Sequence, residues 1–251
     1  MNDALAGMRG SLLALAIGAN LFFNTQAASA ADPDALWKIV HEKCVVAIAP
    51  CAVVDPAEHA AVLKDRNGVA QFLLIPTDKI TGVEDPALLK PETPNFFADA
   101  WDHRDLMQAK LPSPIPQDAI SLAVNAQTAR SQNQLHIHID CLSPEARAAI
   151  KAQSGSVGAE WAPLAAPVAG HLFLARRVEG DSLRAFNPFR SIAATLSDPA
   201  ASMYRRNVVI VGADFTSGPG FIALTDDAPA VPMGYGGGED VQDHSCAVAR
   251  P

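Results

Sequence analysis

Hydrophobic and polar residues recur along the chain with two different periods, and the change of period predicts where strands and helices lie. Residues 60–65 and 69–75 have strand-like composition on either side of a turn at residues 66–68 that contains Asn-Gly. Asn-Gly is a strong signal for a tight turn between antiparallel strands, so these segments predict a hairpin. Two further strands are expected over residues 119–124 and 134–141.

Helices are predicted where apolar residues return every three or four positions after a start signal. The first covers residues 34–44. The second covers residues 95–110, with Thr93 as its N-cap and Pro94 at its first helical position. Ser143-Pro144 starts a third helix by the same logic, and a fourth is expected near residues 188–195.

Strand signals in the C-terminal third are shorter, over residues 171–178, 207–212 and 220–224. Hairpins that alternate with helices are typical of an α+β fold with an antiparallel sheet. We therefore expect an α+β antiparallel sheet with flanking helices, followed by a smaller C-terminal α+β layer.

The N-terminus has the pattern of an export signal. Arg9 precedes an apolar stretch over residues 12–23, and Ala28-Ser29-Ala30 supplies a small-x-small cleavage pattern. The stretch is shorter than the roughly 20 residues that a spanning helix needs, so cleavage and weak anchoring both stay open. We expect a signal peptide or N-terminal membrane anchor over residues 1–30 and one domain over residues 31–251.

The excess of acidic over basic side chains limits which classes of molecule the chain is expected to bind. The chain has 27 acidic and 19 basic side chains, a formal net charge of −8, and no run of Lys or Arg. Nucleic-acid-binding proteins need a basic surface to neutralise phosphates, so no nucleic-acid partner is expected. An anionic substrate would have to be held by a few local arginines and backbone N–H groups.

Four cysteines in an exported chain suggest two disulfides. Cys44 and Cys51 are close enough in the sequence to close a small loop, which leaves Cys141 to pair with Cys246. Four free buried thiols are the alternative. A four-cysteine zinc site is less favoured, because the chain has no C-x-x-C pair.

The strand over residues 134–141 is the strongest candidate for chemistry. Side chains alternate between the two faces of a strand, so Gln134, His136, His138 and Asp140 share one face. A row of polar side chains on one face of a strand is either a functional site or a solvent-exposed polar surface. The segment before it favours a site, because it concentrates side chains that suit a phosphate: Asn125, Arg130, Ser131 and Gln132.

Three kinds of site fit this face. Imidazole can attack phosphorus and form a phosphoramidate, which divides one displacement into two. Alternatively, His136 and His138 bind a metal ion whose water attacks, although the sequence nominates no clear further ligands. In the third kind the histidines bind a nucleotide or lipid without catalysis, as in a periplasmic binding protein.

The pattern Gln134-φ-His136-φ-His138, with Ser131 before it, resembles the histidine-triad superfamily. Longer segments are similar to the CDP-diacylglycerol pyrophosphatase family within it, and the four cysteines fall where that family has them. The similar segments follow one another over about residues 35–247: 62–65, 67–68, 72–77, 93–97, 101, 104–105, 121–141, 174–178, 187–189 and 242–246.

The resemblance implies hydrolysis of CDP-diacylglycerol to CMP and phosphatidate at the periplasmic side of the inner membrane. It implies no cofactor, no metal and no protein partner; the partners are the lipid nucleotide and the membrane surface. His136 would be the nucleophile that becomes nucleotidylated, with His138 beside it. The residues expected around the phosphates or the nucleotide are Asn125, Arg130, Ser131, Gln132 and Gln134.

Gln134 departs from the superfamily pattern, in which the first triad residue is usually His. An amide forms hydrogen bonds but cannot carry the charge of imidazole, so we expect a changed rate rather than a loss of activity. Three residues are weaker candidates: Asn95 beside a nucleobase, Arg177 at a phosphate, and His244 near the triad across the Cys141–Cys246 bridge.

Overall fold

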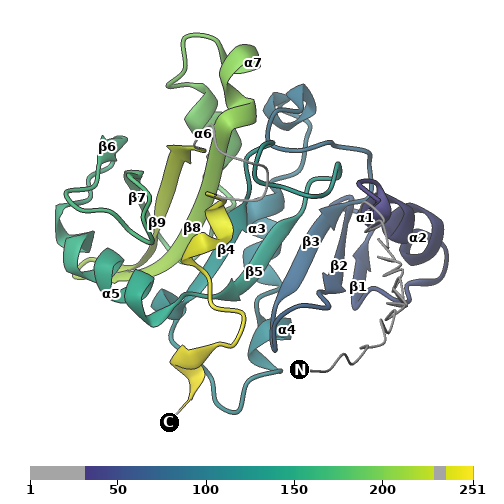
Figure 1. Cartoon of the computed structure of the whole chain (residues 1–251), viewed down its shortest axis with the longest axis horizontal. Helices are drawn as coiled ribbons and strands as arrows, with labels where there is room; N and C mark the ends of the chain where they lie inside the picture. The colour runs from purple at the N-terminus through teal and green to yellow at the C-terminus, as the bar shows by residue number, and fades with distance from the viewer. Residues whose placement is uncertain (1–31, 229–235, 251) are drawn as a thin grey trace, which may run out of the picture. The chain divides into compact units, whose positions relative to one another are not determined.

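The computed structural model describes residues 32–228 and 236–250. Within these residues nine strands form one sheet, in the order β1-β2-β3-β5-β4-β8-β9-β7-β6 (Figure 1), and neighbouring strands are antiparallel. The strands are β1 (Val53–Asp55), β2 (Ala60–Lys64), β3 (Phe72–Pro76), β4 (Ile120–Val124), β5 (Ile137–Cys141), β6 (Ala162–Pro163), β7 (Leu174–Glu179), β8 (Arg206–Phe215) and β9 (Gly218–Asp227).

Short helices connect these strands. The α-helices are α1 (Ala35–Ile39), α2 (Val45–Ala47), α3 (Phe96–Asp102), α4 (Asp105–Gln108), α5 (Pro144–Gln153), α6 (Pro188–Ala193) and α7 (Pro199–Ser202). A π-helical turn, Val40–Cys44, joins α1 to α2. The 3-10 turns are Pro86–Leu89, Gln117–Ala119, Ser154–Ser156, Met203–Arg205, Gly238–Val241 and Ala247–Ala249.

The hairpin predicted from Asn-Gly is present as β2 and β3, with Leu63 opposite Leu73. Gly68 in the turn has a φ of +69°, which glycine adopts without a steric penalty. A Cβ on Gly68 would lie 3.0 Å from the Cβ of His244. This glycine therefore both reverses the chain and lets the C-terminal segment approach the turn.

The C-terminal strands do not form a smaller separate layer, so that part of the sequence prediction is wrong. Ser121 to Val124 of β4 pair with Val211 to Val208 of β8, and this ladder joins both halves into one sheet. The continuous apolar run in β8 is the physical reason. A strand that is apolar on both faces must be covered on both sides, which a central position in a large sheet provides.

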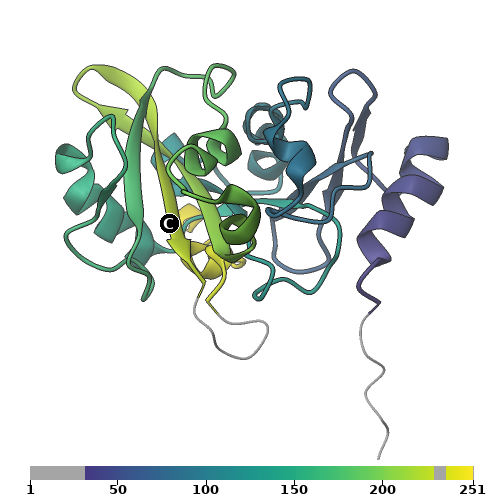
Figure 2. The same cartoon turned by 90° about the horizontal axis from the view of Figure 1, so that it is seen from above.

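The two faces of the sheet carry different apolar clusters. On one face, Ile137 and Ile139 of β5 belong to the largest cluster, which also contains Trp101 of α3 and Phe189 of α6. The opposite face has two smaller clusters, one under the α1–α2 segment and one under α5. These two helical segments lie at opposite ends of the sheet (Figure 2).

A polar gap separates the two smaller clusters. Leu73 belongs to the cluster near α1 and Ala123 to the cluster near α5. His138 is their direct partner in the ladders that β5 forms with β3 and β4. The period of two along β5 therefore places His138 on the face between the clusters, while the isoleucines beside it face the large core.

The second predicted helix is divided into α3 and α4, and it starts one residue after Asn95 instead of at Pro94. The side chain of Asn95 does not cap the helix; its Nδ2 donates to the carbonyls of Leu183 and Phe186, at 2.8 and 3.0 Å. The break lies at residues 103–104, where the guanidinium of Arg104 donates to the carbonyl of Trp101 at 2.7 Å.

The starts of two other helices agree with the sequence. The hydroxyl of Ser143 accepts from the backbone N–H of Ala146 at 3.1 Å, and Pro144 is the first residue of α5. Asn187 caps α6, which starts at Pro188. In both cases a short polar side chain satisfies an otherwise unpaired N–H group in the first turn.

Both expected disulfides are present. Cys44 is bonded to Cys51, and Cys141 at the end of β5 is bonded to Cys246, which fixes the C-terminal segment against the sheet. The expected signal peptide or anchor at residues 1–30 lies outside the described residues. Within residues 32–228 and 236–250, no helix has the length and apolar character that crossing a bilayer requires.

Candidate active site

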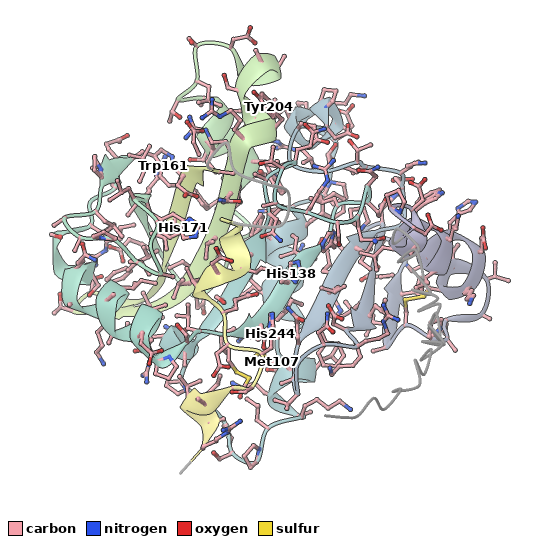
Figure 3. All side chains as sticks on the ribbon, viewed as in Figure 1. Met107, His138, Trp161, His171, Tyr204 and His244 are labelled. Carbon is pink, nitrogen blue, oxygen red and sulfur yellow. A yellow bond between two sulfur atoms is a disulfide. The ribbon has the colours of Figure 1, made fainter. Side chains whose placement is uncertain are left out.

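A cavity of about 790 Å³ opens over the polar gap in the sheet. Figure 3 places His138 on β5 and His244 on the C-terminal segment that passes in front of it. Seven of the residues that the sequence nominated line this cavity: Asn125, Arg130, Ser131, Gln132, His136, His138 and His244. The backbone topology thus brings the loop before β5, the strand itself and the C-terminus to one place.

His136 lies immediately before β5 rather than inside it. Its Nδ1 is 2.7 Å from the backbone carbonyl of Gln134, to which it donates a hydrogen bond. This contact places the ring proton on Nδ1 and leaves the lone pair on Nε2. Burial, together with the neighbouring imidazole of His138, lowers the pKa of His136 to about 4. His136 is therefore neutral at pH 7 and has the form that a nucleophile requires.

His138 is oriented by a carboxylate. Its Nδ1 lies 3.0 Å from Oε2 of Glu239 and 3.0 Å from the side-chain amide of Gln71. Its Nε2 is buried and has no hydrogen-bond partner among the described residues. The rings of His136 and His138 are 4.8 Å apart, centroid to centroid. The second nitrogen of His138 is therefore available to a ligand that sits over His136.

Glu239 is the main site residue that the sequence analysis missed. It comes from the 3-10 turn Gly238–Val241, and its backbone N–H donates to Oδ1 of Asn125 at 3.2 Å. Although burial raises the pKa of Glu239, the charge and hydrogen bond of His138 outweigh it and lower this pKa to about 2. The carboxylate is therefore charged throughout the physiological range.

The glycines before Glu239 were the signal that would have located it. A Cβ on Gly237 would lie 2.5 Å from Oδ1 of Asn125, and a Cβ on Gly238 would lie 2.8 Å from the carbonyl of Val124. Only glycine allows the backbone to come this close to the end of β4. A run of glycines before an acidic residue thus indicates a close approach that delivers the acid to a site.

The residues of the loop before β5 line the cavity in different ways. Arg130 forms a bidentate ion pair with Glu84, with both N–O distances at 2.6 Å, so its terminal nitrogens are already paired. Gln132 accepts from the backbone N–H of Leu36 at 3.0 Å, which joins the loop to α1. Ser131 is exposed at the cavity.

Gln134 acts through its backbone and not through its side chain. Its side chain is buried outside the cavity, where Nε2 donates to the carbonyls of Pro76 and Asp78 at 3.0 and 2.8 Å. Its own carbonyl holds His136. This hydrogen bond from a backbone carbonyl does not depend on the identity of the side chain at position 134.

His244 forms a close pair with Asp140, with Nδ1 and Oδ2 at 2.7 Å. The hydrogen bond to Asp140 raises the pKa of His244. Asp140 is fully buried and also accepts from the backbone N–H of Cys141 at 2.8 Å. This pair, next to the Cys141–Cys246 bridge, sets the position of the C-terminal segment at the edge of the cavity.

Two weaker candidates do not line this cavity. The amide nitrogen of Asn95 is bonded to backbone carbonyls, as described above. Arg177 on β7 pairs with Glu179 at 2.6 Å, and its guanidinium lies 3.7 Å from the ring centre of Phe215. Two cations that the sequence analysis did not select do line it: Lys64 and Arg66, from the β2–β3 hairpin.

Metal binding by His136 and His138 was the alternative chemistry. In the described part of the chain, the one group of three potential ligands close enough to share an ion is Asp140, Cys141 and Cys246. Both sulfurs in that group belong to a disulfide, so they are not thiolate ligands. Nδ1 of His136 is bonded to the carbonyl of Gln134, and Nδ1 of His138 is paired with Glu239. Only the two Nε2 atoms therefore remain as ligand atoms for a metal ion.

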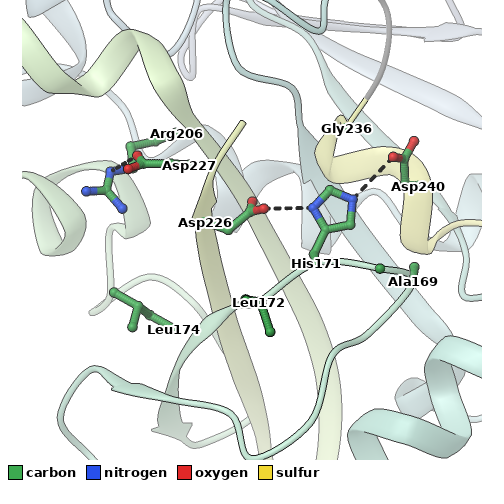
Figure 4. A pocket seen from close by; sticks show the side chains of 10 residues that line it. Ala169, His171, Leu172, Leu174, Arg206, Asp226, Asp227, Gly236 and Asp240 are labelled. Atoms are coloured by element: carbon green, nitrogen blue, oxygen red, sulfur yellow. Dashed lines mark hydrogen bonds and ion pairs between the residues drawn. The ribbon is translucent and has the colours of Figure 1, made fainter. Parts of the chain in front are cut away.

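A second cavity, of about 620 Å³, lies beside His171, where β8 begins and β9 ends (Figure 4). Nδ1 of His171 is 2.7 Å from Oδ2 of Asp226, and its Nε2 is 3.2 Å from Oδ2 of Asp240. The hydrogen bond to Asp226 raises the pKa of His171, although burial opposes this. Both nitrogens are occupied, so this ring has no lone pair to offer a ligand.

Comparison of the sequence with known proteins identifies a family that matches this chain over nearly its whole length. The model of a family described as CDP-diacylglycerol pyrophosphatase matches residues 31–250. A CDP-diacylglycerol pyrophosphatase of Yersinia pestis is 38% identical over 243 residues, which are 94% of this chain and 92% of the relative. A match over nearly the whole chain, with the histidines gathered at one cavity, assigns this chain to the CDP-diacylglycerol pyrophosphatase family.

Proposed function

We propose that this chain hydrolyses CDP-diacylglycerol to CMP and phosphatidate and that His136 is the nucleophile. The observation that carries the proposal is a neutral imidazole whose Nδ1 is bound to a backbone carbonyl and which lines a large cavity. The name of the Yersinia pestis relative supplies the substrate. The His-x-His arrangement on an antiparallel sheet also supports membership of the histidine-triad superfamily.

In the first step, Nε2 of His136 attacks the phosphorus on the cytidine side. A P–N bond forms, the anhydride P–O bond breaks, and its electron pair leaves with phosphatidate. The carbonyl of Gln134 then stabilises the positive charge on the substituted ring through Nδ1–H. His138 enters this step as imidazolium and gives the proton on its Nε2 to the departing oxygen.

In the second step, neutral His138 accepts a proton from water as the water oxygen attacks the same phosphorus. The P–N bond breaks, CMP leaves, and His136 is regenerated. The proton that His138 gave to phosphatidate is replaced by the one from water. Glu239 supports both states of His138, because its carboxylate holds Nδ1–H and directs Nε2 toward the cavity.

The remaining polar residues of the cavity are proposed to bind the diphosphate and the nucleotide. Lys64, Arg66 and Ser131 supply donors from the cavity lining, and Asn125 supplies an amide next to Glu239. Arg130 and Gln132 support this wall through Glu84 and α1. Since the chain is acidic overall, these few local groups have to hold the anion.

The same proposal places the reaction at a membrane. The substrate is a lipid, and residues 1–30 have the sequence pattern of an export signal or anchor. We therefore propose that the enzyme works at the periplasmic side of the inner membrane.

The decisive experiment looks for the covalent intermediate. Full-length protein is mixed with CDP-diacylglycerol, quenched without acid, and digested, and the peptide that contains His136 is examined by mass spectrometry for a cytidylyl adduct. CMP release should persist in EDTA and should be lost in His136→Ala but not in His59→Ala, which changes an exposed histidine. Loss of activity in EDTA with recovery in zinc would favour the metal mechanism. Binding of CDP-diacylglycerol without turnover would favour a binding protein.

A further inference from the structure

Residues 44–51, which include α2, form a short apolar segment that is exposed to solvent between its two cysteines. Between two bonded cysteines, its sequence is Val-Val-Ala-Ile-Ala-Pro, without a polar side chain. Val45, Val46 and Ile48 are 51%, 77% and 59% exposed. They are three of the five large apolar side chains that are exposed in the described part of the chain. We call residues 44–51 the apolar finger.

The base of the apolar finger is fixed while its tip stays exposed. Cys44 and Cys51 are buried beside Leu73 and Ile75, and the disulfide joins them. At the tip, Ile48 has a φ of +66°, a conformation that a β-branched residue rarely adopts. Apolar side chains that are held exposed to solvent gain no stabilising contact within the chain itself. Such side chains on a constrained segment are therefore typical of an interaction site.

The apolar finger is continuous with one wall of the cavity that contains His136. Pro50 of the finger lines that cavity, together with Leu36, Ile39, Leu63 and Leu73. We call these apolar residues the apolar wall. The histidines and the charged groups line the same cavity, and Leu73 of the wall is the direct ladder partner of His138. The cavity therefore presents apolar side chains next to polar ones, a combination that suits a molecule with a phosphate head and acyl tails.

The chain also enters its described part beside this wall. Gln132, which lines the cavity, donates to the carbonyl of Asp32 at 3.0 Å. Asn133 donates through its backbone to the carbonyl of Pro33 at 2.6 Å. The apolar stretch over residues 12–23 ends nine positions before Asp32. Attachment of that stretch to a membrane would hold the apolar wall within reach of the bilayer.

We propose that the apolar finger inserts into the interfacial region of a lipid bilayer and holds the apolar wall of the cavity against it. A lipid nucleotide would then enter with its head group first, while its acyl chains follow the wall. A bilayer is favoured over a second protein chain, because a stable dimer needs roughly 20–30 residues on each side and the finger has eight. The entry route rests on the proposed function; insertion of the finger does not.

Insertion is tested directly by fluorescence in the full chain. Val46→Trp is compared with Leu172→Trp, because Val46 and Leu172 are both 77% exposed. Each is mixed with phosphatidylethanolamine–phosphatidylglycerol vesicles whose acyl chains are brominated or not, and the signal of the three native tryptophans is subtracted. We expect about twofold quenching of the indole added at position 46 and none at position 172. No quenching at position 46, or equal quenching at both, would overturn the proposal.

The kinetic test uses Val46→Asp against Leu172→Asp. On vesicles of CDP-diacylglycerol, Val46→Asp should raise KM about tenfold, because a charge at the tip opposes insertion. On a dispersed short-chain substrate its kcat/KM should change less than about twofold, since the cavity is intact. Unchanged vesicle kinetics, equal loss on both substrates, or a smaller oligomer than the parent in gel filtration would contradict the proposal. If the parent hydrolyses neither substrate, the proposed function fails while the quenching experiment still decides insertion.

Discussion

His136 and His171 are both nearly buried, yet their surroundings have opposite effects on the imidazole ring. His136 lies beside a backbone carbonyl and another imidazole, and its pKa is lowered to about 4. His171 lies between Asp226 and Asp240, and the hydrogen bond to Asp226 raises its pKa. The first ring keeps a lone pair, whereas both nitrogens of the second ring are hydrogen-bonded to carboxylates. Burial therefore does not by itself distinguish a reactive histidine from a structural one; the neighbours decide.

Asp240 and Glu239 are adjacent in the chain but serve the two cavities separately. Glu239 holds His138, and Asp240 holds His171. A single peptide bond in the turn Gly238–Val241 therefore joins the partner of His138 to a partner of His171. This arrangement allows the two regions to be compared by substitutions at matched positions.

The largest expected difference is in catalysis. His136→Ala should lower kcat/KM for CDP-diacylglycerol by at least about 10⁴-fold, because it removes the proposed nucleophile. His171→Ala should lower it less than about tenfold. Both are measured by CMP release from protein whose fold is checked by circular dichroism. An equally large loss in His171→Ala would remove the functional distinction between the two histidines.

The next largest effect is on the free energy of unfolding, where His171→Ala should have a larger effect than His136→Ala. His171→Ala should lower the free energy of unfolding by about 3 kcal/mol, because it leaves Asp226 buried without its charged partner. His136→Ala should change it by less than about 1 kcal/mol, since it removes a neutral ring from a cavity wall. Denaturant unfolding measures both values. A larger loss in His136→Ala would contradict the comparison.

A smaller effect separates the adjacent acids. Glu239→Gln should lower kcat about 100-fold with little change in KM, because His138 loses the charge that would support its proposed proton transfers. Asp240→Asn is the matched control and should change kcat less than about threefold. Equal effects would mean that the turn acts only as a rigid support.

The smallest effect is in the titration of the rings themselves. In an NMR titration His136 should titrate at about pH 4, and His171 above its ordinary value of about 6.5. The His171 pair therefore contributes fully to stability below about pH 6.5, and this contribution is lost as the pH rises through its folded pKa. For His136 the sign is reversed: stability is lost as the pH falls from about 6.5 toward 4. If His136 titrates near 6.5, the assigned environment is wrong.

Local signals predicted the elements around the site well. The Asn-Gly turn, the start of α5 at Ser143-Pro144 and the apolar alternation along β5 all depend on neighbours within a few residues. The late start of α3 was not predictable, because the side chain of Asn95 binds the carbonyls of Leu183 and Phe186, which are distant in the sequence. The single sheet was missed for a similar reason, since the pairing of β4 with β8 joins segments far apart in the sequence.

The sequence by itself determined which residues of β5 share a face with His138, which cysteines stand at distances that suit two bridges, and which family the chain resembles. These properties follow from spacing along the chain. Only the tertiary structure decided that Glu239 reaches His138, that Arg130 is paired with Glu84, and that the side chain of Gln134 binds carbonyls outside the cavity. Such contacts join segments up to about a hundred residues apart, and no local pattern encodes which charged side chain will find which partner.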